Sequence, residues 1–180
     1  MISIQDEVVS GGYLTGPFGC VLQMPTGSGK TWLAEQAIFR TVRQGGRAIY
    51  VTPLRALASE MTARWSDSFP GVSVGVFTGD YGQRSRPFPV SFEKARVLVM
   101  TPERLDACTR SWRSHWSWIP EVELLVVDEI HLLGEPQRGA RLEGALGRFR
   151  RLNPFVRVVG LSATLGNCGE IADWLEGVSY

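Results

Sequence analysis

The sequence is poor in the features that mark several protein classes. It has three cysteines in 180 residues, Cys20, Cys108 and Cys168, and their odd number and wide spacing match neither a disulfide framework nor a metal motif. We interpret them as reduced thiols of a cytoplasmic protein. No apolar run approaches the roughly 18 residues of a membrane helix, and residues 1–9 have no resemblance to a secretory leader. We therefore expect no membrane partner.

The sequence also lacks an excess of charge of one sign. Lys and Arg total 19 against 18 Asp and Glu, a formal net charge of +1, so any nucleic-acid surface has to be local. Hydrophobic residues make up 44% and charged residues 21%, which is typical of a folded globular protein. With 180 residues and no repeat, low-complexity tract or linker, one domain over residues 1–180 is predicted.

The segment 24–31, MPTGSGKT, has the pattern of a phosphate-binding loop, although the general pattern has glycine where this chain has Met24. An apolar run precedes the loop and a helical pattern follows it. Glycines let backbone N–H groups converge on phosphate oxygens, and the helix N-terminus adds partial positive charge. We expect Lys30 to contact the β- and γ-phosphates of ATP and Thr31 to bind Mg²⁺. The predicted nucleotide-binding residues of the loop are Thr26, Gly27, Ser28, Gly29, Lys30 and Thr31.

Two carboxylates, Asp128 and Glu129, follow the apolar strand predicted at 124–127. Ligands bind at the carboxyl ends of strands in open α/β sheets. Asp128 is predicted to share Mg²⁺ with Thr31, and Glu129 to activate the attacking water. An isolated acidic pair would also suit a surface loop, but the phosphate-binding loop upstream favours the catalytic interpretation. The predicted catalytic residues are Glu129, Asp128 and Lys30.

Apolar runs alternate with helical patterns along the chain. Strands are predicted at 20–23, 47–51, 72–77, 96–100, 124–127 and 156–161, and helices at 5–10, 30–44, 54–69, from 102, 138–153 and 170–175. A polar loop is expected at 79–89. Apolar strands that alternate with helices imply an α/β fold, with a mostly parallel sheet and helices on both faces.

Two helices show a clear apolar face. The predicted buried residues are Leu54, Leu57, Ala58, Met61 and Trp65 on helix 54–69, and Leu142, Ala145, Leu146, Phe149 and Leu152 on helix 138–153. For Arg141, Arg148, Arg150 and Arg151, a solvated face is favoured over a nucleic-acid patch. Trp118 is interpreted as core, whereas Trp112 and Trp116 stay open between core packing and stacking on bases.

The ordered motifs resemble those of the superfamily 2 DExH-box helicases, in particular the superkiller-like (Ski-type) group that includes archaeal repair helicases. Residues 24–31 resemble motif I, 52–58 motif Ia, 101–104 motif Ib, 128–131 motif II and 162–164 motif III. The stretches DEIHLLG at 128–134 and GLSATLGN at 160–167 are the most specific to this group. The resemblance covers nearly the whole chain. It implies a RecA-like P-loop NTPase sheet in which strand 156–161 lies between strands 20–23 and 124–127.

By this resemblance the chain is the N-terminal RecA-like ATP-binding domain of an ATP-dependent helicase or translocase. The second RecA-like domain, which carries an arginine finger in the family, is absent from the sequence. Mg²⁺-dependent ATP hydrolysis would drive single-strand translocation and duplex unwinding once the two domains are joined, and the isolated domain is expected to be nearly inactive. The implied partners are that second domain and single-stranded or partly duplex nucleic acid, DNA or RNA.

The resemblance also implies roles for individual residues. Gln5 would correspond to the glutamine that reads adenine, and His131, Ser162 and Thr164 would couple hydrolysis to movement of the nucleic acid. The residues that would hold the backbone of a single strand without reading its bases are Arg55, Thr78, Gly79, Thr101 and Arg104.

Two alternative functions stay open. A P-loop ATPase outside the helicases would not predict the stretches at 52–55 and 101–104, and a nucleic-acid binding assay separates it from a helicase. A non-catalytic module that kept the fold is disfavoured by the intact residues Lys30, Thr31, Asp128 and Glu129. ATPase activity of a longer protein would decide that second case.

Overall fold

Seven strands form one sheet in the computed structural model, which describes residues 4–14, 16, 18–78, 94–164, 166–175 and 177–179. The sheet order is β3-β4-β2-β5-β6-β1-β7, and each of these strand pairs is parallel. The strands are β1 (Gly19–Gln23), β2 (Arg47–Val51), β3 (Val74–Phe77), β4 (Val97–Met100), β5 (Val122–Val127), β6 (Arg157–Ser162) and β7 (Gly177–Ser179). The predicted α/β fold is confirmed, with β6 between β1 and β5 as the resemblance implied.

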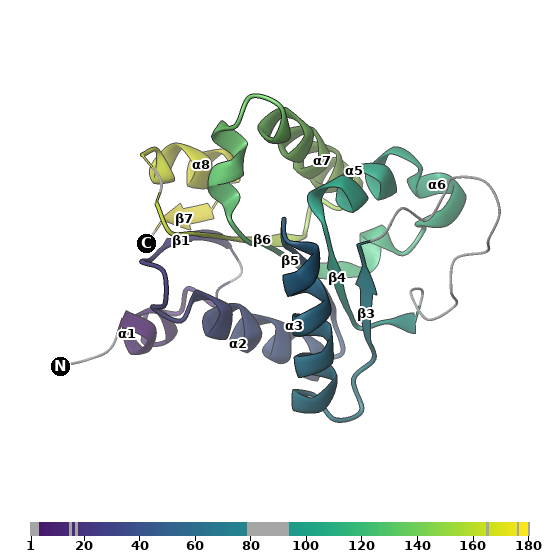
Figure 1. The fold of residues 1–180 in the computed structure, drawn as a ribbon, viewed down its shortest axis with the longest axis horizontal. Coiled ribbons are helices and arrows are strands. Elements are labelled where there is room, and N and C mark those ends of the chain that lie inside the picture. Colours follow the sequence, from purple (N-terminus) through teal and green to yellow (C-terminus); the bar gives the residue numbers. More distant parts are fainter. Residues whose placement is uncertain are drawn as a thin grey trace.

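Helices cover both faces of the sheet (Figure 1). One face carries α1 (Ile4–Ser10), α2 (Lys30–Arg43) and α3 (Arg55–Ser68), and the other carries α5 (Pro102–Arg110), α7 (Arg138–Leu152) and α8 (Cys168–Trp174). The sequence did not predict β7, the short helix α6 (Trp112–His115), or the 3-10 helices η1 (Ile119–Glu121) and η2 (Ile130–Gly134). These elements are too short to show a hydrophobic period.

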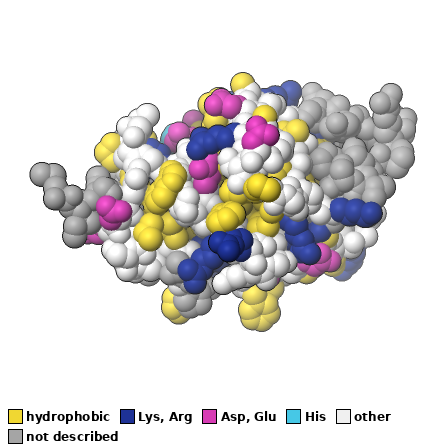
Figure 2. Space-filling view, turned by 90° about the horizontal axis from the view of Figure 1, so that it is seen from below, with side chains coloured by type: hydrophobic (Ala, Val, Ile, Leu, Met, Phe, Trp, Pro, Cys, Tyr) yellow, Lys and Arg dark blue, Asp and Glu magenta, His cyan; other side chains and the backbone are white. Residues whose placement is uncertain are grey.

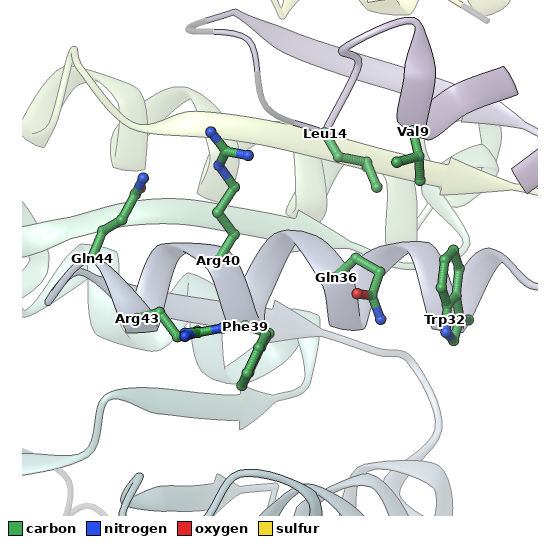
Figure 3. A pocket seen from close by; sticks show the side chains of 8 residues that line it. All are labelled: Val9, Leu14, Trp32, Gln36, Phe39, Arg40, Arg43 and Gln44. Carbon is green, nitrogen blue, oxygen red and sulfur yellow. The ribbon is translucent and has the colours of Figure 1, made fainter. Parts of the chain in front are cut away.

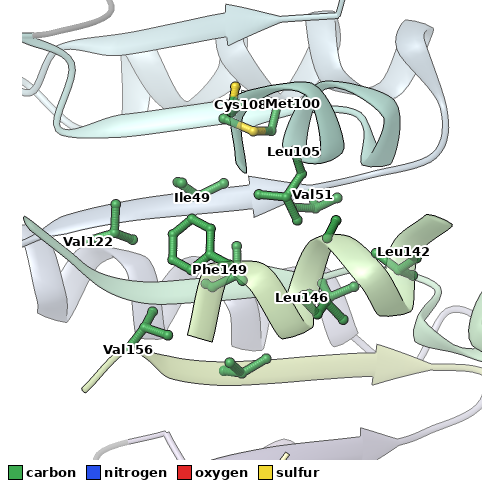
Figure 4. Packing of buried hydrophobic residues seen from close by; sticks show 14 of the residues in the cluster. Ile49, Val51, Met100, Leu105, Cys108, Val122, Leu142, Leu146, Phe149 and Val156 are labelled. Atoms are coloured by element: carbon green, nitrogen blue, oxygen red, sulfur yellow. The ribbon is translucent and has the colours of Figure 1, made fainter. Parts of the chain in front are cut away.

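The core has two parts because successive strand residues point to opposite faces of the sheet. On β2, Ile49 and Val51 pack toward α7, where Leu146 and Phe149 meet them (Figure 4). Their neighbour Tyr50 belongs to the cluster on the α2 and α3 side. Since Asp128 follows the buried Val126 by two residues, the same alternation directs it toward α2.

Leu152 is half-buried at the last turn of α7 and packs against the core, on the face that the sequence predicted. Two predictions about helix faces were wrong. Leu54 is 60% exposed because α3 begins at Arg55, which leaves Leu54 at the N-cap. Arg148 is not solvated with the other arginines, because its guanidinium forms an ion pair with Asp106 of α5 and donates to Thr109 Oγ1 at 3.2 Å.

The tryptophans of segment 112–118 pack in or against the core. Trp118 is 4% exposed, as predicted, and so is Trp116, whose ring meets the Trp118 ring edge-to-face at 5.7 Å. Trp112 is half-buried and packs against the same cluster. Trp116 therefore has no face open to a nucleic-acid base.

Candidate active site

The phosphate-binding loop lies between β1 and α2 and is held by its own side chains. Lys30 Nζ donates to the carbonyl oxygens of Met24 at 2.8 Å and Pro25 at 3.0 Å. Ser28 Oγ donates to the Pro25 carbonyl at 2.6 Å. The only amine of the loop is thereby placed across the concave side of the backbone that would receive phosphate.

Gln5 ties α1 to this loop. Its Nε2 donates to the Ser28 carbonyl oxygen at 3.0 Å. Gly29, the N-cap of α2, has a φ of 93°, and a Cβ there would overlap the Gln5 amide. The backbone conformation therefore favours glycine at position 29, and a side chain there would also displace the Gln5 amide. The structure brings Gln5 to the loop, and its contact with adenine stays a prediction.

Asp128 stands at the carboxyl end of β5 with both carboxylate oxygens engaged. Oδ2 accepts a hydrogen bond from Tyr50 Oη at 2.9 Å, and Oδ1 accepts one from the Glu129 backbone N–H at 3.0 Å. Burial raises the pKa of Asp128, and Lys30 lies near enough for its charge to act in the opposite direction. Burial also raises the pKa of Tyr50, with the Asp128 carboxylate adding to the effect, so its hydroxyl remains a donor.

The predicted Mg²⁺ ligands suit this ion chemically. The Thr31 hydroxyl and the Asp128 carboxylate are hard oxygen donors, and Mg²⁺ is usually held by one or two such groups together with phosphates and water. A buried carboxylate whose charge is only partly compensated favours a cation. No cluster of three or more His, Cys, Asp or Glu side chains that would hold a metal by itself occurs among the described residues.

Glu129, His131 and Ser162 form a chain of close contacts toward β6, which we call the relay. Glu129 has a φ of 52°, the only positive φ of a non-glycine residue in the described part of the chain, and this conformation costs about 1–2 kcal/mol. Its Oε2 lies 3.2 Å from His131 Nδ1, which in turn lies 3.3 Å from Ser162 Oγ. The single hydroxyl hydrogen of Ser162 goes to the Thr164 carbonyl oxygen at 3.0 Å. In the tautomer whose Nδ1 carries the proton, His131 donates to Ser162 Oγ.

The residues predicted to hold nucleic acid follow the other strands at the same edge of the sheet. Arg55 opens α3 after β2 and is exposed. Arg104, in the first turn of α5, places its guanidinium 4.7 Å from the centre of the Phe77 ring at the end of β3, next to the half-buried Thr78. Thr101, the N-cap of α5, is 2% exposed. Gly79 lies outside the described residues, as does the polar loop predicted at 79–89.

A separate groove runs along the outer face of α2. It has a volume of about 380 Å³ and is lined by Val9, Leu14, Trp32, Gln36, Phe39, Arg40, Arg43 and Gln44 (Figure 3). Figure 2 looks onto this side of the molecule, where hydrophobic side chains lie beside Lys and Arg side chains. The lining contains no residue of the loop at 24–31, so the groove is distinct from the phosphate-binding loop.

Sequence reasoning missed Tyr50 as a site residue, because a tyrosine in a buried strand is normally interpreted as core. Its only signal was a polar hydroxyl in an otherwise apolar strand interior.

The three cysteines are free thiols, and burial raises the pKa of Cys20 to about 11 and of Cys108 to about 12. Across the described residues, no helix combines the length and apolar character needed to cross a membrane.

Comparison with known proteins identifies close relatives of the whole chain. The DEAD/DEAH box helicase family profile matches residues 2–171. A protein named ATP-dependent DNA helicase Hel308 from Methanocella arvoryzae is 36% identical over 178 residues, which cover 96% of this chain and 23% of the relative. The protein of the same name from Pyrobaculum calidifontis is 40% identical over 171 residues, covering 95% of this chain and 23% of the relative.

A solved structure supports the fold. The crystal structure of the DUF1998 helicase MrfA is similar to this chain with a TM-score of 0.75 and 21% identity, over 97% of this chain and 28% of that chain. The chain thus spans about a quarter of the length of the curated relatives it matches.

Proposed function

The chain belongs to the DEAD/DEAH box helicase family, and we propose that residues 1–180 are the N-terminal RecA-like ATP-binding domain of a longer ATP-dependent helicase. The observation that carries this proposal is the common location of Lys30, Asp128 and Glu129. They come from β1–α2 and from the end of β5, and they meet at one edge of the sheet. The relatives are named DNA helicases, so single-stranded DNA is the first nucleic-acid partner to test.

In the proposed reaction, the oxygen of a water molecule bonds to the γ-phosphorus of ATP while the bond from that phosphorus to the β–γ bridging oxygen breaks, and ADP and inorganic phosphate leave. The backbone N–H groups of residues 26–31 receive the phosphates, and Lys30 exchanges its bonds to the Met24 and Pro25 carbonyls for phosphate oxygens. Thr31 and Asp128 would hold Mg²⁺, which would neutralise charge on the phosphates when bound. Glu129 takes the proton from the attacking water as general base. Gln5 reads the adenine from α1.

The strand order supports the proposed coupling between ATP hydrolysis and nucleic acid. Ser162 ends β6, and its carbonyl accepts the backbone N–H of Met24 at 3.0 Å, so the Glu129–His131–Ser162 relay ends beside the phosphate-binding loop. We infer that Glu129 and the loop influence each other through His131, Ser162 and Thr164. The nucleic-acid strand is held by Arg55, Thr78, Gly79 and Arg104, whereas Thr101, at 2% exposed, is too buried to contact it. A second RecA-like domain would complete both the ATP site and the nucleic-acid groove.

Two binding measurements on this chain test the proposal. Calorimetry with ATP and Mg²⁺ is expected to give saturable binding, and fluorescence anisotropy with a labelled single-stranded oligonucleotide is expected to give weak, salt-sensitive binding. Absence of ATP binding would overturn the nucleotide assignment and leave a binding module. ATP binding without strand binding, also absent from the longer protein, would favour a P-loop ATPase outside the helicases.

A further inference from the structure

The Tyr50 hydroxyl lies inside the core and donates a hydrogen bond to Asp128. The residue is 0% exposed and belongs to the cluster between the sheet, α2 and α3. In the register of β2 with β5, Tyr50 is paired with Val126, so its side chain leans along the sheet to reach Asp128 Oδ2 at 2.9 Å. A buried hydroxyl needs a hydrogen-bond acceptor, and here that acceptor is the carboxylate assigned to Mg²⁺.

The Tyr50 ring packs against Trp65, which is in turn anchored to α2. The Trp65 ring of α3 meets it edge-on, with ring centres 5.1 Å apart and an angle of 87°. Trp65 is 0% exposed, and its Nε1–H donates to Glu35 Oε1 of α2 at 2.9 Å. Arg64 forms an ion pair with the same carboxylate at 2.7 Å. Tyr50 therefore has little freedom to turn its hydroxyl away from Asp128.

The two hydrogen bonds to Asp128 fix the plane of its carboxylate. The terminal torsion of an aspartate is broad when nothing restrains it. Here the Glu129 N–H holds Oδ1 and the Tyr50 hydroxyl holds Oδ2, which leaves one lone pair on each oxygen for another ligand. Loss of either donor would let the carboxylate rotate.

We propose that Tyr50 is a positioning residue that orients the Asp128 carboxylate for the Mg²⁺ of the nucleotide complex. This inference rests on the proposed function, since it needs ATP and Mg²⁺ to bind at this site. Partners that orient a metal ligand typically change metal affinity or activity by about 10- to 100-fold when they are removed. The Tyr50 hydroxyl donates to Asp128 and has no phosphate contact in this scheme, so the effect of removing it should appear only when Mg²⁺ is present.

The test compares ATP affinity in Mg²⁺ with ATP affinity in EDTA, measured by calorimetry on this chain. The gain in affinity from Mg²⁺ should be about tenfold smaller in Tyr50→Phe than in the wild type, while the affinity in EDTA is unchanged. Phenylalanine keeps the ring against Trp65, and circular dichroism checks the fold. The matched control is Tyr13→Phe, which removes a tyrosine hydroxyl between α1 and β1 and should leave the Mg²⁺ gain unchanged.

A double-mutant cycle with Asp128→Asn separates positioning from general stability. If Tyr50 acts through Asp128, Tyr50→Phe has no further effect on the Mg²⁺ gain once Asp128 is replaced. An effect that persists in that background, an equal loss of affinity in EDTA, or an unchanged Mg²⁺ gain would each overturn the inference. If the wild type binds ATP equally well with and without Mg²⁺, the metal assignment fails as well. No ATP binding under either condition would overturn the proposed function itself.

Discussion

The edge of the sheet at the carboxyl ends of the strands has two halves. The nucleotide half comprises the segments after β1, β5 and β6. The strand half, named for the single nucleic-acid strand that it is proposed to hold, comprises the segments after β2, β3 and β4. In the nucleotide half, the functional side chains bond to one another or to nearby backbone, as Lys30, Asp128 and Ser162 do. In the strand half, Arg55 is exposed and Arg104 lies over an aromatic ring.

This difference follows from what each half is proposed to do. Proton transfer and phosphate transfer depend on atomic positions, so their groups gain from being fixed before the substrate arrives. Holding a nucleic-acid backbone without reading its bases depends on charge and on N–H groups, which tolerate variable geometry. We therefore expect variants in the nucleotide half to change rates and ATP affinity strongly, and variants in the strand half to change strand affinity mildly.

The first prediction concerns the arginine that a second domain is proposed to add to the nucleotide half. A transition-state arginine from a second domain is worth about 10³–10⁵ in rate. We expect steady-state ATP turnover by this chain to be lower by about that factor than turnover by a protein extended through the second domain, with single strand present in both assays. Strong strand-stimulated turnover by residues 1–180 alone would mean that the site is complete in this chain or is completed by self-association.

The second prediction concerns Glu129 in the extended protein. Glu129→Gln keeps the shape of the side chain but removes the proton acceptor, so turnover should fall by about 10²–10⁴-fold while ATP affinity is kept. Glu135→Gln, at an exposed position after η2, is the matched control and should keep the parent rate. Parental turnover in Glu129→Gln would show that another group is the base.

The third prediction tests whether the two halves are separable. Lys30→Ala should weaken ATP binding by about 10²-fold, which corresponds to about 2.8 kcal/mol, because a direct charged contact with phosphate is lost. Calorimetry measures this loss, and anisotropy should find strand affinity unchanged. Lys94→Ala removes an exposed lysine before β4 and should alter neither value. Unchanged ATP affinity in Lys30→Ala would remove the loop at 24–31 from the site.

The fourth prediction concerns the strand half. Arg55→Ala should weaken single-strand binding by a few-fold and lower the slope of log affinity against log salt by about 0.7, the value for one phosphate contact on a single strand. ATP affinity should not change. Arg151→Ala, from the exposed side of α7, is the matched control. Equal losses in both variants would indicate a diffuse charge effect in place of a contact at Arg55.

Local patterns predicted most of the fold. The strand at 47–51 and the helix start at 102 were predicted where the structure has β2 and α5, because apolar runs and an N-terminal proline are properties of neighbouring residues. Leu54 and Arg148 were misassigned for the opposite reason. The exposure of Leu54 depends on where α3 begins, and the partner of Arg148 is Asp106, which is distant in sequence.

The sequence by itself determined the loop at 24–31 and the acidic pair 128–129, because each motif is written in consecutive residues at the end of an apolar strand. Only the tertiary structure decided which of these residues meet. The pairing of β6 with β1 brings Ser162 to Met24, and the pairing of β2 with β5 brings the Tyr50 hydroxyl to Asp128. Strand order and register are set by packing on both faces of the sheet, over sequence separations that local periodicity does not encode.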